Sequence, residues 1–149
     1  MRFSTKTRYG LRALIDLGIY YEGKPVFVKD IAKRQNLSER YLEHIMLTLK
    51  KAGILRSIKG GKGGYAFLKD PSEIRVREIV EILEGTISPV ECVEKKEICG
   101  RSENCVAREL WSRIKEEILK FFDGITLKEL IEKQKEKNEK KEKTVFYEI

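Results

Sequence analysis

The most constraining feature of the sequence is a pair of short helical patterns joined by a tight turn. Residues 29–35 form the first pattern, Asn36-Leu37 forms the turn, and Ser38 is a favourable N-cap for a second helix over residues 39–51. Apolar residues recur at helical spacing in this second helix, namely Leu42, Ile45, Met46 and Leu49. A short helix, a tight turn and a capped second helix together predict a helix-turn-helix.

A β-hairpin is predicted directly after the second helix. Two apolar stretches, residues 54–58 and 65–68, flank the turn Lys59-Gly60-Gly61-Lys62-Gly63-Gly64. The glycines let the backbone approach another surface closely, and the two lysines place positive charge at the tip, which suits a phosphate or a minor groove. A flexible turn would explain the glycines but not the lysines, and the spacing lacks the GxxxxGK[ST] pattern of a P-loop. We therefore interpret the hairpin as the wing of a winged helix-turn-helix.

The rest of the chain contains helical patterns separated by one aperiodic segment. Helices are predicted over residues 5–21, 75–84 and 106–122, and a capping box formed by Thr126 and Glu129 starts a last helix. The fold class is therefore mainly α (α+β), a winged helix-turn-helix domain with a C-terminal dimerisation helix. The predicted units are a DNA-binding domain (1–85), a cysteine-containing cluster-binding loop (86–105), the dimerisation and C-terminal helices (106–137), and a charged tail that is a candidate for disorder (138–149).

Positive charge is concentrated in the first half of the chain. Residues 1–70 contain 15 Lys/Arg and 6 Asp/Glu, a net charge of +9, whereas residues 71–149 contain 16 and 18, a net charge of −2. A polyanion is therefore expected to dock on the N-terminal half, although a Lys-rich surface alone also produces an excess. The sequence has no long apolar run and no secretory leader, so we expect a cytoplasmic protein without a membrane span. The single His and the lack of an acid–base constellation favour a binding protein over an enzyme.

The start of the second helix is the predicted DNA-reading surface, because this helix of the motif enters the major groove with its N-terminal residues near base edges. Arg40 can donate two hydrogen bonds to a guanine edge, and Glu43 can accept one from cytosine N4. Exposed charges on helices are also common without any such role. The predicted DNA contacts are Ser38, Glu39, Arg40, Tyr41, Glu43 and His44 from the helix, with Lys59, Gly60 and Lys62 from the wing.

All three cysteines, Cys92, Cys99 and Cys105, lie in the aperiodic segment. An odd number of cysteines in a cytoplasmic chain argues against a disulfide framework. Thiolates in a polar loop are soft ligands that suit an iron–sulfur cluster or zinc, but the paired CxxC spacing usual for structural zinc is missing. A thiol redox switch and inert buried thiols are the alternatives that the sequence leaves open.

The helix predicted over residues 106–122 has more apolar surface than a small chain needs for its own core. Its apolar residues are Leu110, Trp111, Ile114, Ile118, Phe121 and Phe122. A single helix-turn-helix reads few bases, and a dimer doubles the site, so we expect this helix to pair with a second copy. An ordinary core helix within one chain is the alternative.

These motifs together resemble the IscR-type family of bacterial winged-helix regulators, which includes IscR-, NsrR- and CymR-like proteins. The matching stretches occur in order over nearly all of residues 1–135: MRFSTKTRYGLRAL, Asp30-Ile31-Ala32, Ser38 through Glu43, Gly63-Gly64-Tyr65, the cysteines, Leu110-Trp111, and Ile125-Thr126-Leu127 with Glu129-Leu130. The resemblance implies a homodimeric transcription factor that binds a double-stranded DNA operator, with Arg40, Tyr41, Glu43, Lys59 and Tyr65 at the DNA face.

The resemblance also implies that Cys92, Cys99 and Cys105 hold an iron–sulfur cluster, [2Fe-2S] in preference to [4Fe-4S], with a fourth ligand that is not a cysteine. The expected function is a regulator that senses iron–sulfur status, redox state or nitric oxide. A winged-helix regulator that uses the cysteines as a thiol redox switch or a zinc site is the alternative.

Two positions depart from the family pattern and leave the fourth ligand open. Arg108 stands where the IscR pattern places a His, and Arg8 stands where NsrR-like members have an acidic residue. The interval between the first two cysteines is also one residue longer than in IscR. The candidates for the fourth ligand are Glu109, Asp16, His44 and an exogenous group.

Overall fold

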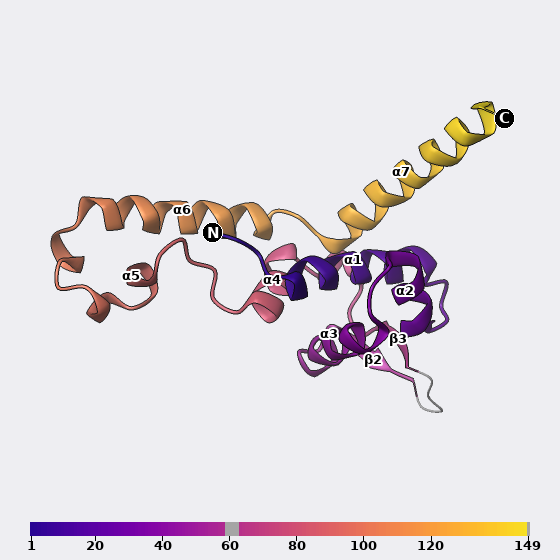
Figure 1. Ribbon diagram of the computed structural model, residues 1–149, viewed down its shortest axis with the longest axis horizontal. Coiled ribbons are helices and arrows are strands. Elements are labelled where there is room, and N and C mark those ends of the chain that lie inside the picture. The colour runs from indigo at the N-terminus through magenta and orange to yellow at the C-terminus, as the bar shows by residue number, and fades with distance from the viewer. Residues whose placement is uncertain (59–62, 149) are drawn as a thin grey trace.

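The computed structural model describes residues 1–58 and 63–148 (Figure 1). Its N-terminal part contains the helices α1 (Thr5–Tyr20), α2 (Val28–Gln35), α3 (Glu39–Lys51) and α4 (Val76–Glu84), with a short 3-10 turn, η1 (Pro71–Glu73), before α4. The strands β1 (Val26–Phe27), β2 (Leu55–Ser57) and β3 (Gly64–Phe67) form an antiparallel sheet in the order β1-β3-β2. This arrangement confirms the predicted mainly α fold with a winged helix-turn-helix.

The turn between α2 and α3 depends on two residues with special backbone roles. Asn36 has φ 54° and ψ 52°, a left-handed conformation that Asn tolerates better than most residues. The Ser38 hydroxyl then accepts a hydrogen bond from the Tyr41 backbone N–H at 3.3 Å, which caps α3 as the sequence predicts. The apolar faces of the two helices meet α1 in one core, whose fully buried members include Leu14, Leu17, Ile31, Leu42, Ile45 and Leu49.

The segment with the cysteines contains only short elements. These are α5 (Glu91–Glu94) and the 3-10 turns η2 (Lys96–Ile98) and η3 (Ser102–Asn104). The buried Ser102 hydroxyl is placed to donate to the backbone carbonyl oxygens of Lys96 and Cys99, at 2.7 and 2.9 Å. The Ser102 side chain thus connects η3 to η2, in a segment that has no periodic apolar pattern.

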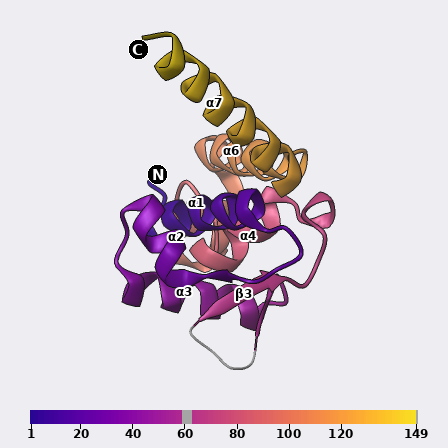
Figure 2. The ribbon, with the colours of Figure 1, turned by 90° about the vertical axis from the view of Figure 1, so that its right-hand side faces the viewer.

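The two C-terminal helices extend from the winged domain in different directions (Figure 1). Helix α6 (Val106–Asp123) runs above the cysteine segment, and α7 (Leu127–Glu148) lies against α1 before its second half projects outward (Figure 2). A Cβ built on Gly18 of α1 would clash with Ile131 Cδ1, so glycine permits the close approach of α7. Among the described residues, no helix is long and apolar enough to cross a membrane.

Residues 138–148, which belong to the predicted charged tail, continue α7 as a helix to Glu148. Lys and Glu are good helix formers, and opposite charges four residues apart support a helix even without burial. Lys128 and Glu132, near the start of α7, form one such pair, with Lys128 Nζ 4.0 Å from Glu132 Oε1.

The end of α4 is tied to the start of α1 through the Glu84 carboxylate. This carboxylate accepts hydrogen bonds from the backbone N–H and hydroxyl of Ser4, with shortest distances of 3.1 and 2.9 Å, and from the Thr7 hydroxyl. Burial alone would raise the pKa of Glu84, but the hydrogen bonds from Thr7 and Ser4 outweigh it and lower the pKa. The ionised carboxylate is thus the form that the folded protein stabilises.

We expect the substitution Glu84→Gln to destabilise the protein at pH 7 by about 1 kcal/mol, since it weakens charge-assisted hydrogen bonds. Because the folded-state pKa is lowered, this stability is present above the unfolded-state pKa and is lost as the pH falls below about 4. Urea unfolding from pH 7 to 3 should therefore show the two proteins converging in acid. Glu73→Gln is the control on an exposed carboxylate, and a pH-independent difference between Glu84→Gln and the natural protein would contradict the assignment.

Candidate DNA interface and cysteine segment

The first turns of α3 present the predicted DNA-contact residues to solvent. Six of these residues are exposed, namely Ser38, Glu39, Arg40, Tyr41, Glu43 and His44. Leu42 and Ile45 of the same helix are fully buried and hold α3 on the domain core. The helix therefore presents an unobstructed polar surface of the kind that enters a major groove.

Basic residues of α1 lie next to this surface, although no motif in the sequence indicates that they do. The Tyr41 ring packs edge-on against Tyr9 of α1, with ring centroids 6.2 Å apart. The guanidinium groups of Arg8 and Arg12 lie 6.0 and 5.5 Å from the Tyr9 centroid. The only sequence signal was the basic N-terminal run, which gave no indication that α1 would contact the start of α3.

The wing is described only at its base. Lys59, Gly60 and Lys62, which are predicted to contact DNA, lie outside the described residues. Gly63 has φ +70°, a conformation that favours glycine, and a Cβ built on it would lie 3.8 Å from Glu43 Oε1. The base of the wing is therefore adjacent to the DNA-reading end of α3.

Tyr65 differs from the other predicted contacts because its side chain is only 8% exposed. It lies on β3, the central strand, which hydrogen-bonds to a neighbour on each side. Burial, together with the nearby Glu43 carboxylate, raises the pKa of Tyr65. This placement fits a supporting role beneath the DNA face better than a direct contact by the whole ring.

The three cysteines are free thiols at three different points of their segment. Cys92 lies in α5, Cys99 lies between η2 and η3, and Cys105 is the N-cap residue of α6. Cys99 is exposed and the other two are partly buried. Within the described part of the chain, no group of three or more His, Cys, Asp or Glu residues is placed to hold a metal ion. The thiols share one segment but do not converge in this arrangement.

The candidates for a fourth ligand are placed very differently. Arg108, at the position of the expected His, instead donates from Nε to the Cys92 carbonyl oxygen at 2.9 Å. Asp16 is 2% exposed and accepts hydrogen bonds from Arg34 and Gln35, so this candidate is already occupied. His44 is exposed on α3, and Glu109 is exposed on α6, one turn after Cys105. Of the three candidate residues, Glu109 is nearest in sequence to a cysteine.

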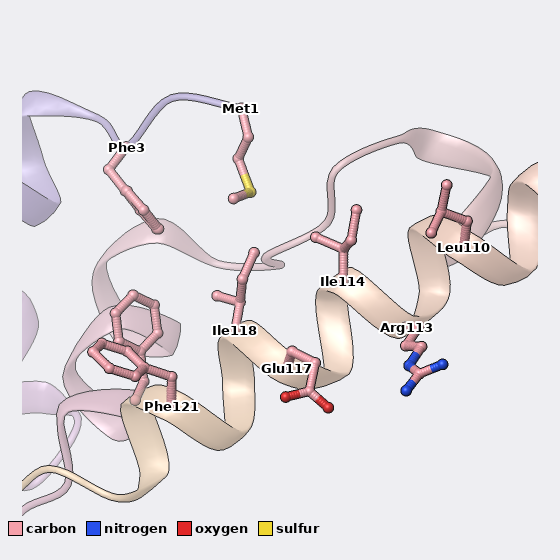
Figure 3. Close-up of a pocket in the computed structure, with 9 residues that line it drawn as sticks. Met1, Phe3, Leu110, Arg113, Ile114, Glu117, Ile118 and Phe121 are labelled. Atoms are coloured by element: carbon pink, nitrogen blue, oxygen red, sulfur yellow. The ribbon is translucent and has the colours of Figure 1, made fainter.

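Helix α6 has an apolar face that its own chain leaves largely uncovered. None of its residues is fully buried, and Leu110, Ile114 and Phe121 are 53%, 36% and 65% exposed. With Met1 and Phe3 they line an open hollow of about 540 Å³ (Figure 3). Other apolar side chains of α6 pack beside a buried cluster of the same chain, namely Ile118, Leu119 and Phe122.

Comparison with known proteins identifies relatives over most of the chain. The family model described as Rrf2, an iron-dependent transcriptional regulator, matches residues 3–133. The HTH-type transcriptional regulator CymR of Bacillus subtilis is 41% identical over 130 residues, covering 87% of this chain and 89% of CymR. The HTH-type transcriptional regulator IscR of Serratia proteamaculans is 35% identical over 134 residues, covering 90% of this chain and 81% of IscR.

Solved structures give the same result. The structure of CymR, described as the global cysteine regulator of B. subtilis, superposes with a TM-score of 0.72 at 39% identity, covering 89% of this chain and 97% of CymR. The structure of T. potens IscR superposes with a TM-score of 0.71 at 34% identity, covering 90% of this chain and 88% of that one. The relatives are named as transcriptional regulators and not as enzymes.

Proposed function

The chain belongs to the Rrf2 family of transcriptional regulators, and from this premise we propose that it is a homodimeric regulator whose cysteine segment controls its binding to a DNA operator. The matches to CymR and IscR confirm the resemblance to IscR-type regulators. The observation that carries the proposal is the exposed polar end of α3, held on a buried apolar face and flanked by the base of the wing. Sequence is read by such side chains, whereas phosphate contacts position the protein.

The operator is the first thing to establish. Selection of bound duplexes from random DNA by the full-length protein should yield a two-fold symmetric site, because a dimer reads two half-sites. Binding should weaken steeply with salt, since phosphate contacts release counterions. Lack of duplex binding even at low salt would overturn the regulator assignment.

We expect Arg40→Ala to weaken operator binding by about 1–3 kcal/mol per half-site contact and to relax base preference at one position. Arg40→Lys keeps the charge but loses the two-pronged hydrogen bond, so it should also relax the preference. Fluorescence anisotropy against single-base variants of the selected operator measures both effects. Lys135→Ala, which removes an equal charge from exposed α7, is the control. Uniform weakening on every sequence would assign Arg40 to the phosphate backbone instead.

An iron–sulfur cluster is the sensory group that we favour, with Cys92, Cys99 and Cys105 as its ligands. The donor chemistry fits, because three free thiols lie in one segment and thiolates are the usual protein ligands of such clusters. The description of the family as iron-dependent and the match to IscR support this choice. Among the described residues the three thiols are not grouped around one point, so binding of a cluster would require the cysteine segment to rearrange. A bound cluster would supply a centre sensitive to iron supply, oxidants or nitric oxide.

Within the chain, the segment has a direct route to the proposed dimer helix. Cys105 is the N-cap residue of α6, and Arg108 on the first turn of α6 holds the Cys92 carbonyl oxygen. Rearrangement at Cys92 or Cys105 would therefore act on the start of α6, and through the dimer on the spacing of the two α3 helices.

A thiol switch without a cluster is the second candidate, and two observations favour it. An arginine, Arg108, occupies the position of the expected histidine ligand and donates to the Cys92 carbonyl oxygen. The relative with 41% identity, CymR, is described as a cysteine regulator. Operator binding measured anaerobically with reconstituted, apo and oxidant-treated protein separates the candidates. A response only to iron and sulfide supports the cluster, a response only to oxidant supports the thiol switch, and equal affinity in all states removes the sensor proposal.

A further inference from the structure

We propose that a polar cavity between α1, α2 and α7 is a binding site for a small carboxylate-bearing molecule. The cavity has a volume of about 330 Å³, at the lower end of the range of small-molecule sites. Its polar lining comes from three helices, with Arg12 and Asp16 on α1, Arg34 and Gln35 on α2, and Gln134 and Asn138 on α7. None of these residues is a cysteine or a predicted DNA contact, but Arg12 also lies beside Tyr9, in the basic part of α1 next to the start of α3.

A partly exposed arginine, Arg34, neutralises the only carboxylate of the lining, the buried Asp16. Asp16 is 2% exposed, and the Arg34 guanidinium donates to its two oxygens from Nε and Nη2, with distances between 2.7 and 3.1 Å. Gln35 Nε2 donates to Asp16 Oδ2 at 2.9 Å. Since Asp16 and Arg34 cancel, Arg12 leaves the lining with one net positive charge. The cavity therefore favours an anion.

Both guanidiniums are oriented before any ligand binds. Arg12 donates from Nε and Nη2 to the Gln35 side chain and carbonyl oxygens, at 3.2 and 2.6 Å. The Arg34 guanidinium lies 3.8 Å from the centroid of the Tyr20 ring. In the hydrogen bonds of the described residues, the Nη1 nitrogen of each arginine is not engaged. Planar guanidiniums held in this way match the geometry of a carboxylate.

Helix α7 contributes two side-chain amides to the cavity. Gln134 Nε2 donates to Asn138 Oδ1 at 3.0 Å, which leaves the Asn138 amide group as a donor and Gln134 Oε1 as an acceptor toward a ligand. Ile15 and Ile19 add apolar surface to the same cavity. One uncompensated guanidinium, an amide pair and a short apolar wall indicate a small organic acid with an aliphatic part.

The first experiment is calorimetric titration of the full-length protein with succinate, L-glutamate and inorganic phosphate at constant ionic strength. We expect saturable binding of at least one carboxylate, one molecule per chain, and binding of phosphate at least about tenfold weaker. In NMR spectra, the side-chain amide signals of Gln134 and Asn138 should shift with the same saturation curve. Absence of saturable carboxylate binding up to about 10 mM, or equal binding of phosphate, would overturn the proposal.

Variants locate the binding in the cavity. Arg12→Gln and Asn138→Leu change residues outside the Asp16–Arg34 ion pair, so both proteins should fold. Thermal unfolding checks this. Each should weaken carboxylate binding by at least about tenfold. Lys137→Gln removes a charge from the neighbouring exposed position on α7 and should change binding less than about twofold. Equal loss in Lys137→Gln would assign the binding to general charge attraction and overturn the site.

Discussion

Phe121→Glu is expected to make the protein monomeric and to lower its operator affinity at least about 100-fold, because linkage of two half-site readers is lost. Phe121 is 65% exposed on α6 and lines the same open hollow as Leu110 and Ile114. In a dimer formed through this face, a glutamate would be desolvated without a partner, at a cost of several kcal/mol. Light scattering gives the oligomeric state, and anisotropy with the selected operator gives the affinity.

The design distinguishes loss of the dimer from loss of the fold. Phe121 is exposed in the single chain, so the substitution should leave the melting of the winged domain nearly unchanged. Val145→Glu, on the projecting half of α7, places the same charge on another apolar residue that is 49% exposed. This control should stay dimeric with natural affinity. A dimeric Phe121→Glu protein with natural operator affinity would assign the dimer to another surface.

The winged domain is the part that the sequence predicts well, because its signals are local. The cap at Ser38, the turn at Asn36 and the apolar spacing of residues 39–51 each act within a few residues, and α3 has the predicted bounds. The same reasoning places the two hairpin strands within one or two residues. Local propensity and burial agree in this region, so little depends on distant contacts.

Tertiary contacts decide the features that the sequence does not predict. The burial of Tyr65 follows from the central position of β3 in the sheet, which the hairpin pattern alone does not specify. The pairing of Asp16 with Arg34 joins α1 to α2, and the packing of Ile131 against Gly18 joins α7 to α1. None of these contacts has a signature within a short window of sequence.

The cysteine segment shows the same limit at the candidate site. An aperiodic sequence has no spacing from which the directions of Cys92, Cys99 and Cys105 follow, so their number suggests a ligand set but not its geometry. The contact made by Arg108 also has no signature in the sequence. The sequence shows only that it replaces a His, whereas the structure shows its guanidinium on the Cys92 carbonyl oxygen.

Cys92→Ser, Cys99→Ser and Cys105→Ser are each expected to lower the iron and sulfide bound after anaerobic reconstitution at least about tenfold, since four ligands hold a typical cluster. The chain has three cysteines, so no spare thiol can replace a lost one. Each variant should also lose the difference in operator affinity between reconstituted and apo protein. Metal analysis, visible absorption and anisotropy measure the three effects. Glu97→Gln, an exposed change in the same segment, is the control and should bind iron and sulfide normally.

Arg108→His tests the remaining position of the ligand set. A His at this position, in the first turn of α6, would remove the guanidinium that donates to the Cys92 carbonyl oxygen. It would supply a neutral nitrogen ligand in its place. If Arg108 keeps the segment from closing on a cluster, this variant should retain iron and sulfide longer in air than the natural protein. Glu109→Gln should instead lose iron and sulfide faster if the neighbouring carboxylate is the fourth ligand.

Normal iron and sulfide in all three serine variants would exclude the cysteines as ligands and leave the thiol switch as the sensory chemistry.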